Sequence, residues 1–288
     1  MGTFIGHALP GAFFIIVSIW WIIQFVYTKI VLDNGRQRPR SRLMYCLHRF
    51  PIEGSLIVFG GVVGFIAEMM YPAPKWTLID SEGHWKHQVE WQHVTMYTYF
   101  ALYGGIMVMG RSCVPSVAGK YEKAFGALAF AVEGFLFHFH THGRSDLDVQ
   151  LHTMLVVAIF ICFLSTSAEA WRPKDTLVEL IRILFTLVQG TWFWHVGIVL
   201  YIPPGGEPWD PEDHLNVMFT TVMFTWHILV DMLVLFFFYG ITKLALKMCG
   251  FSSVRYSQMS NGPEEHEVKL LGNNTEAGNH LLRGSESD

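Results

Sequence analysis

The sequence predicts an all-α membrane protein, a single bundle of about seven transmembrane helices with a lumenal amino terminus and a cytosolic carboxyl terminus. Of its 288 residues, 51% are hydrophobic and 15% are charged, whereas soluble domains carry about 25% charged residues. Apolar stretches of about 18 residues or more, long enough to cross about 30 Å of hydrocarbon, recur through the first 250 positions. Lysine and arginine concentrate in alternate loops, as expected of a chain that crosses a membrane repeatedly.

Charged residues, proline and glycine bound the apolar stretches and place helices near residues 8–28, 52–70, 91–110, 121–141, 149–170, 176–201 and 216–247. We interpret the first stretch as a retained helix, because it lacks a basic start and its apolar run from Phe13 to Val26 passes any small-residue cleavage site. The connections are short, so residues 1–250 are expected to form one seven-helix transmembrane domain. The polar residues 251–288 are expected to form a disordered cytosolic tail.

Basic residues set the predicted orientation, because loops rich in lysine and arginine stay on the cytoplasmic side. The first loop carries six of them: Lys29, Arg36, Arg38, Arg40, Arg42 and Arg49. Alternation puts most other basic residues of the loops on the same side and leaves Lys75, Lys86 and Arg144 across the membrane. The sequon at Asn273 would then be cytosolic and carry no glycan.

Several classes of function are disfavoured by the sequence. The four cysteines, which include Cys46 and Cys249, fall outside the predicted lumenal segments, so no disulfide framework is implied. The net charge of −4 suggests no nucleic-acid partner. Phosphate-binding loops, a Gly-x-Ser-x-Gly elbow and a His-Glu-x-x-His pair are absent from the sequence. The lipid bilayer is the predicted partner. Protein partners are unknown, and small residues at 60–64 leave a homo-oligomer open.

The histidines are distributed unequally, since eleven of fourteen fall at the predicted lumenal face or in the lumenal halves of helices. Residues three or four apart share a helix face. This spacing pairs Glu90 with His93, His138 with His142 and His227 with Asp231, and it predicts that His140 points elsewhere. Ionisable groups deep in a bilayer mark functional sites by default. The candidate metal ligands are therefore His93, His138, His142, His152, His195, His227, Asp231, Glu133 and Glu68.

These residues admit more than one interpretation. Neutral imidazoles and one or two carboxylates that converge from several helices would suit a divalent metal, zinc above all. The histidines could instead donate hydrogen bonds between helices. They could also respond to lumenal pH, because imidazole titrates between about pH 5 and 8. Haem ligation is a fourth and weaker alternative.

Several motifs are specific: Gly6-His7-Ala8-Leu9-Pro10-Gly11, Glu133-Gly134-Phe135-Leu136-Phe137 followed by the histidine run, Gln189-Gly190-Thr191-Trp192-Phe193-Trp194, and Trp226-His227. With them, residues 1–247 resemble the transmembrane protein 45 family, which includes the transmembrane epididymal proteins. The resemblance implies a multi-pass protein of the Golgi, endosome and lysosome, with the plasma membrane as a further compartment. It also implies that Glu68, His93, Glu133, His142, His152 and His227 are family features.

The resemblance implies no established enzymatic activity. If the site binds a metal, either transport or intramembrane hydrolysis would be the consequence, and a metal-dependent hydrolase is the lesser alternative. Two functional hypotheses therefore stand. In the first, a lumen-facing site of histidines and carboxylates binds a divalent metal. In the second, the chain is a trafficking or scaffolding membrane protein whose histidines are structural or pH-responsive.

Overall fold

The computed structural model describes residues 3–32 and 51–248, which form seven long α-helices. In these two ranges, β-pairing is limited to an isolated bridge between Ile79 and Trp85. The helices are α1 (Phe4–Tyr27), α3 (Ile52–Met70), α4 (Gln88–Ser112), α5 (Lys120–Phe139), α6 (Asp146–Trp171), α7 (Thr176–Tyr201) and α8 (His214–Met248). A π-helical turn, η1 (Thr28–Leu32), follows α1, and a 3-10 turn, η2 (Pro115–Val117), lies between α4 and α5.

The predicted all-helical fold class is confirmed, and each predicted helix has its counterpart. The largest difference is at the first helix, which begins at Phe4 rather than near residue 8. Its start is fixed by Thr3, whose hydroxyl accepts a hydrogen bond from the Gly6 amide at 3.0 Å. A threonine cap accepts a hydrogen bond from a backbone N–H that has no partner within the first turn. Because the cap residue is polar, a search for apolar stretches does not detect this helix start. The first loop's Arg36 to Arg49, the tail from residue 251, Cys46, Cys249 and Asn273 lie outside the described residues.

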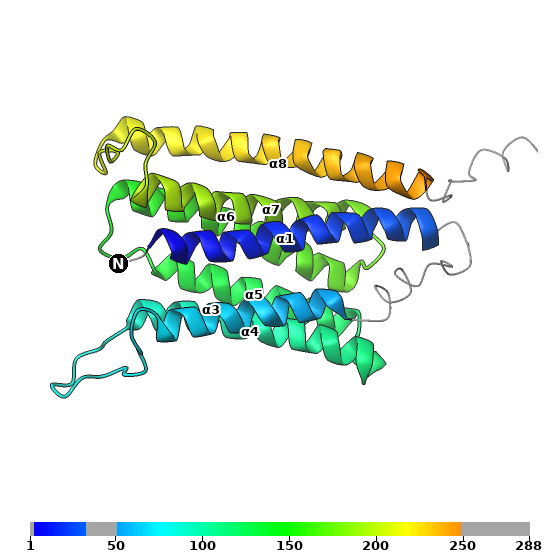
Figure 1. Cartoon of the computed structure of the whole chain (residues 1–288), viewed down its shortest axis with the longest axis horizontal. Helices are drawn as coiled ribbons and strands as arrows, with labels where there is room; N and C mark the ends of the chain where they lie inside the picture. Colours follow the sequence, from blue (N-terminus) through cyan, green and yellow to red (C-terminus); the bar gives the residue numbers. More distant parts are fainter. Residues whose placement is uncertain (1–2, 33–50, 249–288) are drawn as a thin grey trace, which may run out of the picture.

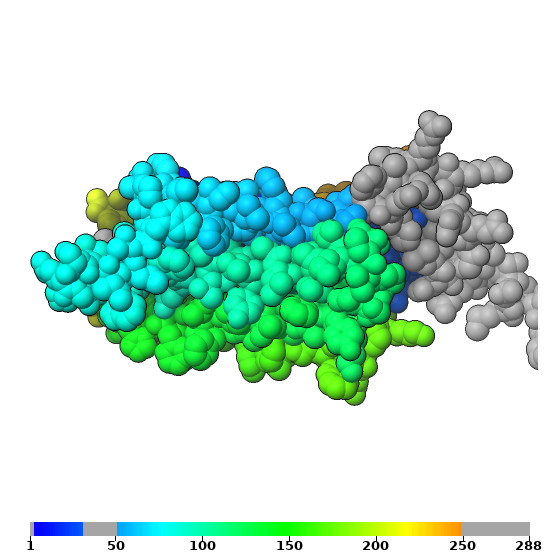
Figure 2. All heavy atoms as spheres, turned by 90° about the horizontal axis from the view of Figure 1, so that it is seen from below, coloured from blue at the N-terminus to red at the C-terminus, as the bar shows by residue number. Residues whose placement is uncertain are grey.

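Consecutive helices run in opposite directions along the long axis of the molecule (Figure 1). The start of α1 and the connections 71–87, 140–145 and 202–213 therefore lie together at one end, which we call the amino-terminal end of the bundle. Residues 113–119 and 172–175 lie at the opposite end. The 71–87 connection, in cyan, projects beyond the helices (Figure 2).

Close backbone approach holds several helices together. Gly11 of α1 faces Gly190 of α7 so closely that a Cβ on Gly190 would lie 2.9 Å from the Gly11 carbonyl oxygen. Gly54 of α3 and Gly104 of α4 make the same kind of contact, at 2.7 Å. Small residues favour such packing in membranes, where lipid tails supply no hydrophobic driving force between helices.

Five helices are long and apolar enough to cross a membrane, namely α1, α3, α6, α7 and α8. The surface is apolar as well, with Phe236 and Phe237 of α8 more than 60% exposed. Such exposure of large apolar side chains fits contact with lipid rather than with water. Helix α4 carries tyrosines, glutamines and threonines, and α5 begins with Lys120-Tyr121-Glu122-Lys123, which lowers their hydropathy. The chain is therefore a multi-pass membrane protein in contact with the bilayer.

Candidate functional site

Four histidines and a glutamate meet in a pocket near the amino-terminal end of the bundle, which we call the histidine pocket. It encloses about 490 Å³ of space between atoms, including the space at its mouth. Residues from α1, α4, α5, α6 and α7 form its walls. Its polar side chains are those of His7, His93, Tyr97, His140, His152 and Glu133, and its apolar side chains include Pro10, Phe14, Met96, Phe100, Phe137 and Phe193.

The direction of the helices explains why residues so far apart in sequence meet. His7 lies in the first turns of α1, His93 in the second turn of α4 and His152 in the second turn of α6. His140 directly follows the last residue of α5. Because consecutive helices run in opposite directions, three helix starts and one helix end come together at the same end of the bundle.

The four imidazole rings form a connected row around the pocket. The ring centroids of His93 and His140 are 5.2 Å apart, those of His140 and His152 are 6.0 Å apart, and those of His152 and His7 are 5.8 Å apart. Phe137 contacts the rings of His93, His140 and His152. His140 points away from His138 and His142, as predicted, but it lies in the same pocket as the candidates His93 and His152, because α5 ends at Phe139 and helical spacing no longer applies beyond it.

Three of these histidines are oriented by hydrogen bonds from Nδ1. His7 Nδ1 donates to the Thr3 carbonyl oxygen at 3.0 Å, and His152 Nδ1 to that of Asp148 at 2.9 Å. His93 Nδ1 lies 3.0 Å from the carboxylate of Glu68. A carbonyl oxygen can only accept, so Nδ1 carries the proton and Nε2 keeps its lone pair. Within residues 3–32 and 51–248, no hydrogen bond engages Nε2 of these three histidines.

His140 differs from the other three because both of its ring nitrogens have partners. Nδ1 lies 2.7 Å from Oε1 of Gln92, and Nε2 accepts from Arg144 Nη2 at 2.7 Å. Burial, the nearby His93 and the Arg144 guanidinium together lower the pKa of His140 to about 3. A histidine with this pKa stays neutral even in an acidic lumen at about pH 5. We interpret His140 as a structural link between α4 and the 140–145 connection.

Glu133 lies at the inner end of the histidine pocket and is only 2% exposed. Its Oε1 accepts a hydrogen bond from Gln189 Nε2 at 2.7 Å. Its Oε2 is buried and has no hydrogen-bond partner among the residues that the structure describes. A buried polar atom without a partner is costly, and it commonly marks a place where water, an ion or a ligand binds.

The remaining candidates form a second group between α7 and α8. Thr191 donates to Asp231 Oδ2 at 2.6 Å and lies 3.1 Å from His227 Nδ1. His227 Nε2 in turn lies 3.4 Å from His195 Nδ1. His195 stacks on Trp192 at a centroid distance of 4.6 Å, and its Nε2 is buried without a partner within the described ranges. The group is a linear chain of hydrogen bonds and does not converge on one point.

Helix geometry separates the two groups. Gln189 and Thr191 are two residues apart on α7, which turns the side chains about 200° from one another. Gln189 therefore faces Glu133 on α5, while Thr191 faces Asp231 on α8. Glu133 and Asp231 therefore belong to different groups, and the interpretation in which they share one site does not hold.

His138 and His142 lie outside both groups. Both are exposed, and they contact the ring of Phe139. Glu90, which was paired with His93 on spacing, forms an ion pair with Lys75 at 3.1 Å instead. Throughout the described part of the chain, no three His, Cys, Asp or Glu side chains are already grouped so that they could hold a metal ion.

Sequence reasoning missed several polar residues. His7 was part of the amino-terminal motif but had no partner at helical spacing, so it could not be assigned to the pocket. Gln189, buried in the Gln189-Gly190-Thr191 motif, was likewise not recognised as the partner of Glu133. At the opposite end of the bundle, Arg182 is 3% exposed and donates to Glu169, which also pairs with Lys123 at 2.7 Å. A buried arginine on an apolar helix is the signal that could have found this ion pair.

Comparisons with known proteins agree with this description. A family model described as a family of unknown function (DUF716) matches residues 119–240. Transmembrane epididymal protein 1 of Rattus norvegicus is 26% identical over 91% of this chain and 90% of its own length. Transmembrane epididymal protein 1A of Mus musculus is 24% identical over the same shares.

Transmembrane epididymal protein 1 of Homo sapiens is 29% identical over 60% of this chain and 66% of its own length. The family model covers α5, α6, α7 and most of α8, and so includes Glu133, His152 and the α7–α8 group. These matches confirm the resemblance predicted from the motifs: the chain is similar to the transmembrane epididymal proteins.

Proposed function

We propose that this protein is a seven-span membrane protein of the endomembrane system that binds a divalent metal in a lumen-facing histidine pocket. The observation that carries the proposal is the orientation of His7, His93 and His152. Each holds its Nδ1 proton on a carbonyl or carboxylate oxygen and leaves the Nε2 lone pair without a hydrogen bond inside the described ranges. Metal-ligating histidines are oriented in this way in proteins of known structure.

Zinc is the metal that this set of side chains suits best. Three neutral imidazoles with a fourth position for water or another ligand are a common catalytic zinc environment. The pair of Glu68 and His93 corresponds to the carboxylate and histidine arrangement that raises ligand basicity. The ring centroids of His7 and His152 are 5.8 Å apart, and the His140 ring lies between those of His93 and His152, so binding a metal would require the three ligand rings to move toward one another. Side-chain rotation of this kind is a small movement compared with a helix shift.

The predicted side of the membrane follows from the orientation of the bundle. The histidine pocket lies at the end of the bundle that carries the start of α1. Because basic residues concentrate in the loops of the other end, we place this end in the lumen. The names of the relatives support a transmembrane protein. Golgi, endosome and lysosome are the compartments that we propose.

The first test measures metal directly. Protein purified without chelator and reconstituted in nanodiscs should contain zinc at about one ion per chain by elemental analysis. His152→Ala removes a proposed ligand and should lower the metal content. Glu68→Gln removes only the partner of a ligand and should weaken affinity about 10- to 100-fold. His138→Ala is the matched control, since His138 is an exposed histidine of the same region.

Stability gives an independent readout. Metal that binds only the folded protein stabilises it by RT ln(1 + [L]/Kd), so a chelator should lower the melting temperature of the wild type and should have little effect on His152→Ala. Wild-type protein without stoichiometric metal, together with a melting temperature indifferent to chelator, would contradict the proposal. The histidines would then be structural hydrogen-bonding residues of a trafficking or scaffolding protein.

A further inference from the structure

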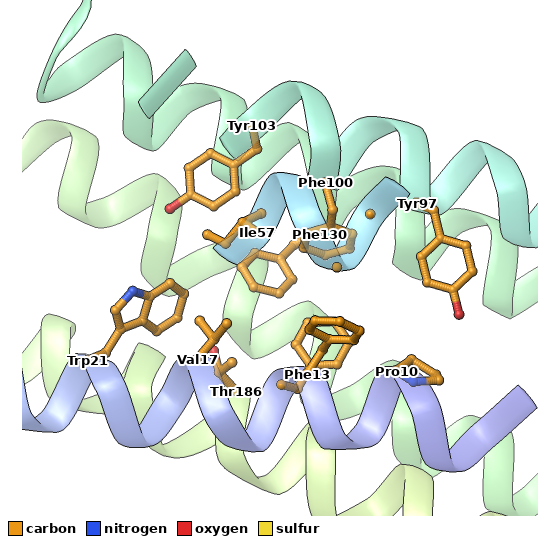
Figure 3. A pocket seen from close by; sticks show the side chains of 13 residues that line it. Pro10, Phe13, Val17, Trp21, Ile57, Tyr97, Phe100, Tyr103, Phe130 and Thr186 are labelled. Atoms are coloured by element: carbon orange, nitrogen blue, oxygen red, sulfur yellow. The ribbon is translucent and has the colours of Figure 1, made fainter. Parts of the chain in front are cut away.

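A second cavity adjoins the histidine pocket toward the middle of the bundle, and we call it the apolar cavity. It encloses about 550 Å³ of space between atoms, including the space at its mouth. The two cavities share Pro10, Phe14, Tyr97 and Phe100 in their walls, so they adjoin along these residues. In Figure 3, Pro10 and Tyr97 lie at one end of the apolar cavity, and Trp21 and Tyr103 lie at the other.

The histidine pocket forms a polar end, and the apolar cavity forms an apolar body next to it. Aromatic and aliphatic side chains surround the body, with Phe13 and Val17 of α1 facing Ile57, Phe100 and Phe130 across it (Figure 3). The polar end carries Glu133 and the histidines. From these observations we propose that the joined cavities bind a lipid with a single acyl chain, whose chain fills the apolar cavity and whose polar head lies in the histidine pocket.

Length supports a single acyl chain. The lining residues of α1 extend from Pro10 to Trp21, and a rise of about 1.5 Å per residue makes this distance about 16 Å. One leaflet of a bilayer contributes about 15 Å of hydrocarbon, half of the usual core. A chain of ordinary membrane length therefore fits along α1 with its head toward the amino-terminal end of the bundle.

The head has to satisfy Glu133. Its Oε2 is buried and without a hydrogen-bond partner in the described residues, and Glu133 is one of the residues that line the polar end. A head with a carboxyl or hydroxyl group can share a proton with this oxygen, which removes the cost of leaving it without a partner. A long-chain fatty acid is the simplest molecule with these properties, and it is the probe that we choose.

Access is available from the bilayer. Helix α1 packs extensively on α7 but touches α3 much less. At the border between α1 and α3, the Phe13 ring covers Gly60. A Cβ added to Gly60 would lie 2.7 Å from Cδ1 of this ring. Rotation of Phe13 would open the cavity toward lipid without moving a helix. The proposal goes beyond the metal site, because it requires the pocket and not the metal.

The experiment uses a fatty acid with a photoreactive group near the end of its chain, added to the full-length protein in nanodiscs. Labelling should map to peptides that contain Val17, Trp21 and Tyr103, because these residues lie toward the end of the cavity far from the head, and unlabelled fatty acid should compete for it. Val17→Phe fills the cavity and should lower the competed labelling about tenfold. Val62→Phe is the matched control, because Val62 is 45% exposed on the outer face of α3 and should leave labelling unchanged.

Several results would contradict the lipid site. Labelling that unlabelled fatty acid does not compete for, or that Val17→Phe leaves unchanged, would overturn the proposal. Equal competition by an alkane of the same length would overturn the role of the polar end. Metal content is measured on the same samples and should be normal in Val17→Phe. A protein that lacks metal but shows competed labelling contradicts the metal proposal and supports this one.

Discussion

At the scale of single residues, the hydrogen bonds of each histidine separate possible ligands from structural residues. His140 uses both ring nitrogens, one toward Gln92 and one toward Arg144. His152 and His7 use one each, toward carbonyl oxygens of their own helices. Four histidines in one pocket thus have two different chemical roles, and the difference depends on the atoms beside each ring. It does not depend on burial, because His7, His140 and His152 are all buried.

The first prediction at this scale concerns pH. The pKa of His140 is lowered from 6.5 to about 3 in the folded protein, so between these pH values the unfolded chain binds a proton that the folded chain does not. Stability therefore falls as pH drops from about 6.5 toward 3. His140→Gln removes this contribution, and the difference in melting temperature between about pH 7 and pH 5 should become smaller than in the wild type.

The control for this experiment is His138→Gln. His138 is exposed, and its replacement should preserve the wild-type dependence on pH. His93, His152, Asp148 and Arg144 also face His140, so the comparison is made between variants rather than on the wild type alone. If the melting temperature depends on pH equally in His140→Gln and the wild type, His140 is not the residue that causes the loss of stability at low pH.

At the scale of helices, the contact between α1 and α7 fixes the position of His7. Gly11 and Gly190 let the two backbones approach, and a Cβ on Gly190 would meet the Ile15 amide nitrogen at 2.8 Å and the Gly11 carbonyl at 2.9 Å. These atoms belong to a helix backbone and cannot move separately. The position of His7 opposite His152 therefore depends on Gly11, one turn further along α1, and on Gly190 of α7.

We expect Gly190→Ala to push α1 away from α7, with a loss of stability of about 1–3 kcal/mol, the usual cost of overpacking. The melting temperature of the purified protein measures it. Gly105→Ala is the control, because a Cβ at Gly105 meets nothing within 4 Å. On helix propensity, that substitution should be neutral or slightly stabilising. Similar losses in both variants would mean that propensity or the lipid environment, and not the α1–α7 contact, decides stability.

At the scale of the whole molecule, the ends of the helices define two faces with different chemistry. The histidine pocket lies at the amino-terminal end of the bundle, whereas the ion pairs of Glu169 with Arg182 and Lys123 lie toward the other. Desolvation offsets most of the attraction in a buried pair of this kind. Polar contacts are present toward both ends of the bundle, and the hydrogen bond of Thr191 with Asp231 lies between them.

The last prediction concerns orientation. The 71–87 and 202–213 connections lie at the same end as the start of α1, so sequons introduced into either connection should both be glycosylated if that end is lumenal. A tag at the carboxyl terminus should be accessible to antibody only after the membrane is permeabilised. The natural sequon at Asn273 should remain unmodified. A glycan at Asn273 would reverse the orientation and place the histidine pocket in the cytosol.

The sequence by itself determined the helices and their apolar character. Long apolar segments have few alternatives in lipid, because only a helix satisfies its own backbone hydrogen bonds there. Charged and proline residues between them then located the ends within a few positions, as in α3 (Ile52–Met70) and α7 (Thr176–Tyr201). Depth was predictable as well, since a residue's distance from a helix end follows from a fixed rise per residue.

Only the tertiary structure decided which deep polar residues meet. Sequence spacing relates residues on one helix, but His7, His93 and His152 belong to three helices whose rotation about their axes is set by packing. Close contacts such as that of Gly11 with Gly190 fix this rotation. For the same reason, Gln189 and Thr191 face different helices although they are two residues apart. The partner of a polar residue in a membrane bundle depends on how each helix is rotated about its axis. The residue pattern of a single helix does not predict this rotation.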